Sequence, residues 1–360
     1  MIPIEKLRLT KVIYSHAHCP DGLASAMILK DAFRMLGMEP RIEFLTHGTK
    51  EHAQAGISGD GVTLFCDIAP TPDVAQLTRA TGTIIVLDHH KGAEALVRSF
   101  GDLSVFADEK LDPGVSGATL AWREVWEPVN RETGTHDFLM GAVPINVKEF
   151  AYCVGARDTW QTKDPRFQRG QWISKMLMSK PAAHWLGGTR RVELENGAVH
   201  DVPERAVLPY LHESEVEMGR ALFEAHEEAV RQAVEQVVAY ALIGAGVDVY
   251  LYVFQEQASG FRLCSDVAEA LRQQTDGRTN AAVVAGFAYV VHEPGDSPQL
   301  VYSLRGLNGF DVAALAKTNG GGGHTAAAGF AVDPHRELIG RTPYDDIRSR
   351  LAAFLKGLNP

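Results

Sequence analysis

The sequence has few cysteines and no pairing pattern among them. Four cysteines, Cys19, Cys66, Cys153 and Cys264, are spread over 360 residues, and none belongs to a CxxC pair. This spacing excludes a disulfide-stapled scaffold and a zinc knuckle. A chain of this length buries most of its surface without such support. At about 100–200 residues per domain it is long enough for two or three domains.

Basic residues are also in short supply. Lysine and arginine number 35 against 45 aspartates and glutamates, which gives a net charge of −10. The chain therefore lacks the overall basic surface of a protein that coats long duplexes. This balance leaves room for local basic pockets and for an acidic site that holds metal, and it favours short substrates over long ones.

Long apolar runs are absent as well. None approaches the roughly 18 residues that span a bilayer. The opening residues, MIPIEKLRLTKVIYSH, carry scattered charges and no apolar signal-peptide region. We therefore expect a cytoplasmic protein that does not act at a membrane. The sequence also has no convincing internal repeat and no low-complexity tract; its longest glycine run is Gly320 to Gly323.

Short apolar runs alternate with helical patterns in the first half of the chain. We predict strands at 10–15, 41–46, 62–66 and 83–87, and helices at 23–36, 72–79, 115–126 and 147–156. This alternation is typical of an α/β fold with a parallel sheet, because parallel strands are joined by crossover helices. Ligands of such sheets bind at the carboxyl ends of the strands, so we expect the reactive residues there.

The second half predicts a connector followed by a smaller α/β domain. Residues 160–200 have no clear assignment. Apolar residues three to four apart from Leu222 to Val238 indicate an amphipathic helix. After Gly246 the strand and helix patterns alternate again and end in a helix near 344–355. The predicted domains are residues 1–200, a helical connector at 201–243, and residues 244–360.

Acidic and histidine residues cluster after the predicted elements. The clusters are SHAHCPDG, FCDIAP, LDHHKG and ARDTW, which contribute His16, His18, Asp21, Asp67, Asp88, His89, His90 and Asp158. A lone aspartate there is most often a helix N-cap. An Asp-His-His triplet after a buried strand is different, because ligation or catalysis must offset its desolvation. These donors predict a site for Mn²⁺, Fe²⁺, Zn²⁺ or Mg²⁺, and the absence of thiolates argues against structural zinc.

The motifs resemble those of the DHH phosphoesterase superfamily, in the same order. The chain has an HxxxxDG opening, an aspartate after the next strand, the DHH triplet at Asp88–His90, an SGA segment at Ser116–Ala118 and a final aspartate. YSLRG at Tyr302–Gly306 and GGGGHTAAAGF at Gly320–Phe330 are similar to the DHH-associated substrate domain. The resemblance covers nearly the whole chain. The opening is most similar to the branch of nanoRNases and cyclic-nucleotide phosphodiesterases.

The resemblance implies roles for individual residues. Residues 1–200 would form the catalytic domain and residues 244–360 the substrate-binding domain. One or two Mn²⁺ ions, or Mg²⁺ or another divalent ion, would be held by His16, Asp21, Asp67, His89 and Asp158. His90 and Asp88 would be catalytic: His90 would face the substrate phosphate and Asp88 would orient a histidine. The candidate substrate-binding residues are Ser116, Arg305, Gly321, Gly322, Gly323 and His324.

The opening motif departs from the commoner family pattern. That pattern has two aspartates two residues apart, whereas this chain has Asp21 alone. His18 and Cys19 occupy the region of the missing aspartate. His18 is a candidate substitute ligand, with lining of the cleft as the alternative.

The resemblance implies a metal-dependent phosphodiesterase. It would release nucleoside monophosphates from short oligoribonucleotides or linear dinucleotides, and it would form a homodimer. Aromatic and basic residues from Trp160 to Trp172 could contact a nucleotide. Alternative substrates are 3′-phosphoadenosine 5′-phosphate, cyclic dinucleotides and polyphosphate. A non-catalytic nucleotide-binding scaffold is a further alternative, which the full set of candidate ligands disfavours.

Overall fold

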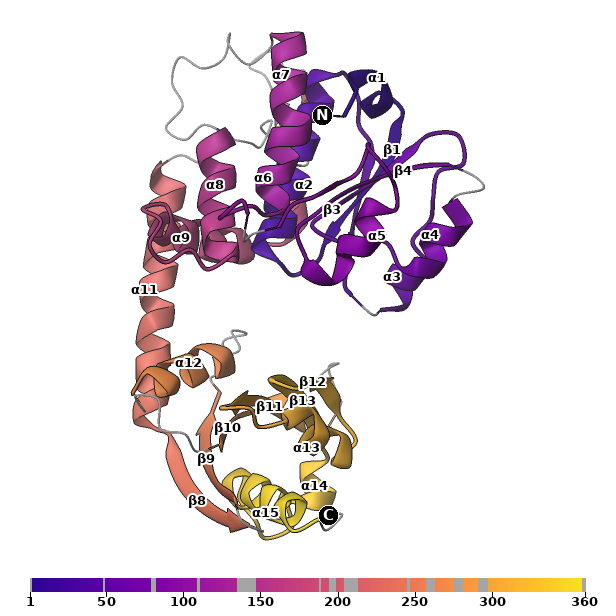
Figure 1. Ribbon diagram of the computed structural model, residues 1–360. Helices are drawn as coiled ribbons and strands as arrows, with labels where there is room; N and C mark the ends of the chain where they lie inside the picture. The colour runs from indigo at the N-terminus through magenta and orange to yellow at the C-terminus, as the bar shows by residue number, and fades with distance from the viewer. Residues whose placement is uncertain are drawn as a thin grey trace. The chain divides into compact units, whose positions relative to one another are not determined.

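The computed structural model describes residues 2–47, 49–78, 82–108, 111–134, 147–187, 189–193, 199–203, 213–244, 247–256, 263–274, 281–290 and 297–357. The chain divides into two compact units, Met1–Glu224 and Ala225–Pro360 (Figure 1). Each unit contains a β-sheet with helices packed on it, which confirms the predicted α/β class. The division falls within helix α11, Glu213–Glu235. No helix among the described residues is long and apolar enough to cross a membrane.

A parallel five-stranded sheet forms the centre of the first unit. Its strand order is β2-β1-β3-β4-β5. The strands are β1 Thr10–His16, β2 Arg41–Leu45, β3 Val62–Cys66, β4 Thr83–Asp88 and β5 Val105–Phe106. Ser15 pairs with Cys66, and Cys66 pairs with Leu87. The carboxyl ends of β1, β3 and β4 therefore lie side by side.

Helices cover both faces of this sheet. They are α1 Ile4–Leu7, α2 Pro20–Met35, α3 Lys50–Ala53, α4 Pro72–Thr78, α5 Glu94–Arg98, α6 Gly117–Ala121, α7 Glu127–Thr133, α8 Val147–Asp158, α9 Phe167–Met178 and α10 Ala182–Trp185. Ile13 packs in the cluster that contains α2, α6, α8 and α9, whereas Val12 and Tyr14 pack in the cluster that contains α4 and α5. Successive residues of a strand point to opposite faces, so one short strand supplies two cores.

Shorter elements complete the first unit. Lys91–Ala93 forms a 3-10 turn, η1, and Trp122–Trp126 forms a π-helical segment, η2, between α6 and α7. A two-stranded hairpin of β6, Thr189–Glu193, and β7, Val199–Pro203, lies in the region without a sequence-based assignment.

The second unit is built on a mixed six-stranded sheet in the order β12-β13-β11-β10-β9-β8. The strands are β8 Val238–Gly244, β9 Val247–Gln255, β10 Ala281–Val290, β11 Gln299–Leu307, β12 Gly322–His324 and β13 Ala327–Val332. β9 and β10 are parallel, and the other described pairs are antiparallel. The helices are α12 Cys264–Gln274, α13 Val312–Thr318, α14 Pro334–Glu337 and α15 Pro343–Leu355.

Candidate metal centre

Three strand ends bring the first candidate residues together. His16 is the last residue of β1, Asp67 directly follows β3, and Asp88 ends β4. Asp67 has a φ of 62°, a left-handed conformation that is costly for a residue with a side chain and is concentrated at functional sites. The sheet order thus places side chains that are distant in sequence at one edge.

Asp67 lies between two histidines. His16 Nδ1 is 3.7 Å from Asp67 Oδ2, and His89 Nε2 is 3.1 Å from Asp67 Oδ1. The Asp67 side chain is 1% exposed and that of His89 is 8% exposed. One carboxylate therefore offers each of its oxygens to a different imidazole, an arrangement suited to a carboxylate that bridges two ions.

Two further carboxylates surround His89. Its Nε2 atom is 3.6 Å from Asp158 Oδ2 and 3.8 Å from Asp21 Oδ2. Asp158 is the last residue of α8, and Asp21 lies in the first turn of α2. This part of the centre therefore combines the His89 imidazole with several carboxylate oxygens.

The start of α6 fixes the orientation of Asp21. The Asp21 carboxylate accepts hydrogen bonds from Ser116 Oγ at 2.7 Å, Gly117 N at 2.6 Å and Ala118 N at 3.0 Å. This close approach requires glycine at position 117, because a Cβ there would lie 2.4 Å from Asp67 Cβ. Ser116 is fully buried and also caps α6, so its role is to position Asp21. The sequence analysis named Ser116 as a substrate-binding residue, but a fully buried side chain cannot contact the substrate.

The donor atoms form three overlapping groups. They are His16, Cys19 and Asp67; Asp67, His89 and His90; and Asp21, His89 and Asp158. Within each group the donor atoms lie within 4.8 Å of one another. His16 Nδ1 and Asp67 Oδ2 are buried and form no hydrogen bond with any described residue. Because buried polar atoms are nearly always paired, these two atoms fit a bound divalent ion.

The charges of the centre also favour a cation. Burial raises the pKa of Asp67, but the neighbouring His16 and the hydrogen bond from His89 outweigh it and hold that pKa well below its usual range. Burial raises the pKa of Asp21 and of Asp158, and the negative charge of Asp67 raises both further. Burial lowers the pKa of His89, but the hydrogen bond to Asp67 and the surrounding carboxylates raise it to about 10. A divalent ion would relieve this concentration of negative charge.

Asp88 positions the two histidines that follow it. The fully buried Asp88 accepts hydrogen bonds from His90 Nδ1 at 2.7 Å, His89 N at 2.8 Å and His90 N at 3.1 Å. The hydrogen bond to Asp88 raises the pKa of His90, against the opposing effect of burial. With Nδ1 bound to Asp88, the Nε2 atom of His90 is the one left for a ligand. His90 is 39% exposed, in contrast to Asp88.

The structure does not bring His18 into the donor groups. His18 is exposed, has a φ of 55°, and lines a cavity of about 700 Å³ together with His16 and Cys19. Cys19, the N-cap residue of α2, belongs to a donor group with His16 and Asp67 instead. The ligand prediction for His18 is therefore corrected, and the alternative that it lines the cleft agrees with the cavity.

His47 is a neighbour of the centre that the sequence analysis missed. Its ring centroid lies 5.0 Å from that of His16 and 5.8 Å from that of His90. His47 follows β2, which pairs with β1. A histidine after a predicted strand was the available signal, but only the sheet order shows that this strand adjoins β1.

The remaining sequence-predicted residues lie in the second unit. Arg305 on β11 donates from Nε to Ser265 Oγ at 2.9 Å, and its backbone pairs with that of Ala327. His324 on β12 also pairs with Ala327, so Arg305 and His324 lie in one row across the sheet. Gly321 is required by packing, because a Cβ there would lie 2.1 Å from Gly329 O.

The other predicted glycines differ in their surroundings. Gly323 has a φ of 142° and packs closely on β13, whereas a Cβ at Gly322 would meet open space. Of the three predicted glycines, Gly322 is therefore the one whose backbone is best placed to be approached by a ligand.

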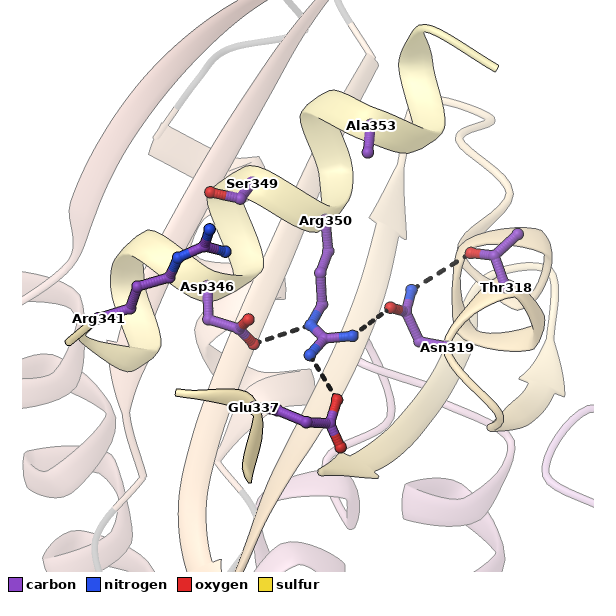
Figure 2. A pocket seen from close by; sticks show the side chains of 8 residues that line it. All are labelled: Thr318, Asn319, Glu337, Arg341, Asp346, Ser349, Arg350 and Ala353. Atoms are coloured by element: carbon purple, nitrogen blue, oxygen red, sulfur yellow. Dashed lines mark hydrogen bonds and ion pairs between the residues drawn. The ribbon is translucent and has the colours of Figure 1, made fainter. Parts of the chain in front are cut away.

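A cavity of about 530 Å³ in the second unit has a structural explanation. Figure 2 shows Arg350 at its centre, donating to Asp346 at 2.9 Å, Asn319 at 2.8 Å and Glu337 at 2.8 Å. These partners come from α15, α14 and the end of α13. The guanidinium is already neutralised by two carboxylates, so it joins three elements and adds nothing to the candidate site.

Comparisons with known proteins identify the fold. Neither a family model nor a curated protein sequence matches the chain. Among solved structures, CDC45 from Entamoeba histolytica is similar with a TM-score of 0.50 and 10% identity, over 97% of this chain and 96% of that one. A DHH-domain member of the s1p family of ribosomal proteins has a TM-score of 0.49 and 14% identity, over 97% and 88%. RecJ from Thermus thermophilus, in complex with Mn²⁺, has a TM-score of 0.45 and 16% identity, over 98% and 53%. The chain therefore shares the fold of this CDC45 structure.

Proposed function

We propose that this protein is a metal-dependent phosphodiesterase that hydrolyses short oligoribonucleotides or linear dinucleotides to nucleoside monophosphates. The observation that supports it most is the convergence of donor side chains from four separate segments of the chain: His16, Asp21, Asp67, His89 and Asp158. A buried carboxylate shared between two sets of donors is typical of sites that hold two divalent ions.

In this proposal His16 and Asp67 hold the first ion, and Asp67, His89, Asp21 and Asp158 hold the second. The carboxylate-rich second position favours Mn²⁺, with Mg²⁺ as the alternative. When bound, such ions polarise a phosphoryl group and lower the pKa of water. The hydrogen bonds from the start of α6 keep Asp21 pointed at His89, so part of this geometry exists before any ion binds.

His90 is the proposed proton donor to the leaving oxygen. Its Nδ1 atom is bound to Asp88, which leaves Nε2 to contact the substrate. The hydrogen bond to Asp88 raises the pKa of His90, so the imidazolium form needed for proton donation persists to higher pH. Asp88 acts through His90 and is a positioning residue.

An exposed aromatic residue beside the centre supports a nucleotide substrate. Trp160 is two residues after Asp158, is 56% exposed and has a φ of 56°. Its ring contacts Phe167 edge-on at 5.4 Å between centroids, and the Arg157 guanidinium lies 6.0 Å from its centroid. An exposed indole held in this way can stack with a base. In the second unit, Arg305, Gly322 and His324 stay candidate substrate-binding residues.

A substrate panel tests this proposal. The full chain with Mn²⁺ is incubated with end-labelled di- to heptaribonucleotides, a cyclic dinucleotide, 3′-phosphoadenosine 5′-phosphate and polyphosphate. We expect the shortest oligoribonucleotides to turn over fastest and to yield monophosphates. Faster turnover of any other member would overturn the choice of substrate. Activity that survives in His89→Ala would show that it does not arise at this centre.

A further inference from the structure

Cys19 lies next to the two buried donor atoms of the first metal position, His16 Nδ1 and Asp67 Oδ2. It is the N-cap of α2 and is partly exposed, and its Sγ atom lies within 4.8 Å of donor atoms of both His16 and Asp67. His16 Nδ1 and Asp67 Oδ2 are 3.7 Å apart, and both are buried without a hydrogen bond to any described residue. Asp67 is 1% exposed, so bulk water does not satisfy its Oδ2 atom.

The other three cysteines form hydrogen bonds within the protein. Cys66, Cys153 and Cys264 are buried, and their Sγ atoms donate to Gly117 O at 3.5 Å, Glu149 Oε1 at 3.6 Å and Ser303 O at 3.1 Å. Each of these three buried thiols therefore already has a hydrogen-bond acceptor. Cys19 instead is partly exposed and lines the cavity of about 700 Å³.

We propose that Cys19 is a ligand of the first ion, which it binds as a thiolate together with His16 and Asp67. This inference rests on the metal centre of the proposed function. A thiolate selects softer ions, so the first position prefers Zn²⁺ or Co²⁺ to Mn²⁺ and Mg²⁺. The second position, with Asp21, His89 and Asp158, has oxygen and nitrogen donors and keeps a preference for Mn²⁺. The centre is therefore suited to two different metals.

The local structure accommodates a thiolate once a cation is present. Without one, burial raises the pKa of the Cys19 thiol, and the charges of Asp67, Asp21 and Asp158 raise it further. A bound divalent ion reverses this balance and displaces the thiol proton to water. The N-terminus of α2, a helix of 16 residues, adds favourable backbone dipoles at Cys19.

Cobalt absorption tests this proposal independently of activity. The metal-free full chain is titrated with Co²⁺ and followed in the near ultraviolet, where cobalt bound to sulfur has a charge-transfer band. We expect the band to grow with the first equivalent of bound ion. It should be lost in Cys19→Ser, which keeps a good N-cap for α2. Cys264→Ala, far from the centre in sequence and in the other unit, should retain it.

A second variant tests the change of metal preference. Cys19→Asp replaces the soft donor with a hard one of similar reach. We expect it to lose the band and to shift the ratio of Mn²⁺ to Zn²⁺ affinity toward Mn²⁺ by about 10-fold or more. Circular dichroism of each variant, compared with the parent chain, establishes that the fold is intact.

The outcomes separate this inference from the proposed function. Cobalt that binds without the band, or a band that persists in Cys19→Ser, would overturn the role of Cys19 and leave the metal centre standing. A chain that binds no cobalt would overturn both.

Discussion

Asp67 has the most demanding environment of any residue in the centre. It is buried, left-handed in its backbone and placed between His16 and His89. Such a backbone conformation costs roughly 1–3 kcal/mol and persists only where the surroundings enforce it. Here the enforcing contacts are the parallel pairing of β3 with its neighbours and the close approach of Gly117.

Asp67→Asn is expected to reduce turnover to background. The amide keeps the shape of the side chain but cannot supply a charge to two ions, so divalent-ion affinity should fall more than about 100-fold. Isothermal titration with Mn²⁺ and the oligoribonucleotide assay measure both effects. Asp102→Asn, on an exposed residue, is the control. Unchanged affinity in the Asp67 variant would contradict the bridging role.

Asp88→Asn is expected to move the alkaline limb of the kcat profile to lower pH. Asp88 raises the pKa of His90, and a group with a raised pKa keeps its proton to higher pH. Removal of the charge lowers that pKa, so the acid form is lost earlier as pH rises. The profile is measured on a dinucleotide at saturating metal. A limb at the same pH in the parent and the variant would argue against His90 as the proton donor.

Trp160→Ala is expected to weaken dinucleotide binding with little effect on chemistry. Stacking of a base is worth about 1–3 kcal/mol, so KM for a dinucleotide should rise roughly 5-fold to 150-fold. A small phosphodiester without a base provides the comparison, because its KM should not change. An equal loss on both compounds would mean that Trp160 supports the structure of the centre and does not contact a base.

At the scale of elements, the centre depends on contacts between segments that are remote in the chain. The start of α6 binds Asp21 at the start of α2, and β2 brings His47 next to His16 and His90. Strands β3 and β4 could be predicted because buried parallel strands are continuous apolar runs. The contacts of Cys19, His47 and Ser116 could not, because they depend on strand order and helix packing that leave no local pattern.

Other elements also could not be predicted from the local sequence pattern. The hairpin β6–β7 is short and polar, and the amphipathic pattern around Leu222 extends to Val238, which is the first residue of β8. Helical spacing and strand alternation both fit a few residues at such a boundary. The sequence therefore predicted the helix but not its change to a strand.

Gly117→Ala is expected to disrupt the centre through the position of α6. The new methyl group would lie 2.4 Å from Asp67 Cβ and 2.9 Å from Asp21 Oδ2, so α6 or both carboxylates must shift. We expect Mn²⁺ affinity to fall about 10-fold to 100-fold, as for the loss of other groups that orient ligands. Gly92→Ala is a matched control, because a Cβ at that position meets no atom within 4 Å. Equal affinities in the two variants would contradict this packing argument.

At the scale of the whole molecule, the chain is acidic overall, and part of its negative charge is concentrated at the metal centre. The chain has a net charge of −10, and four carboxylates, those of Asp21, Asp67, Asp88 and Asp158, gather near the strand ends. A long polyanion gains affinity mainly from many basic contacts, which this composition does not favour. Binding of divalent ions offsets the local repulsion, so the proposed reaction on short nucleotides depends on the metal for binding as well as for chemistry.

The metal content of the purified chain tests the central claim most directly. Metal-free protein is soaked in Mn²⁺, desalted and analysed for bound metal, with His89→Ala treated in parallel. We predict between one and two manganese ions per chain for the parent protein and a clear loss in the variant. Parent protein that retains no manganese after this treatment would contradict the account.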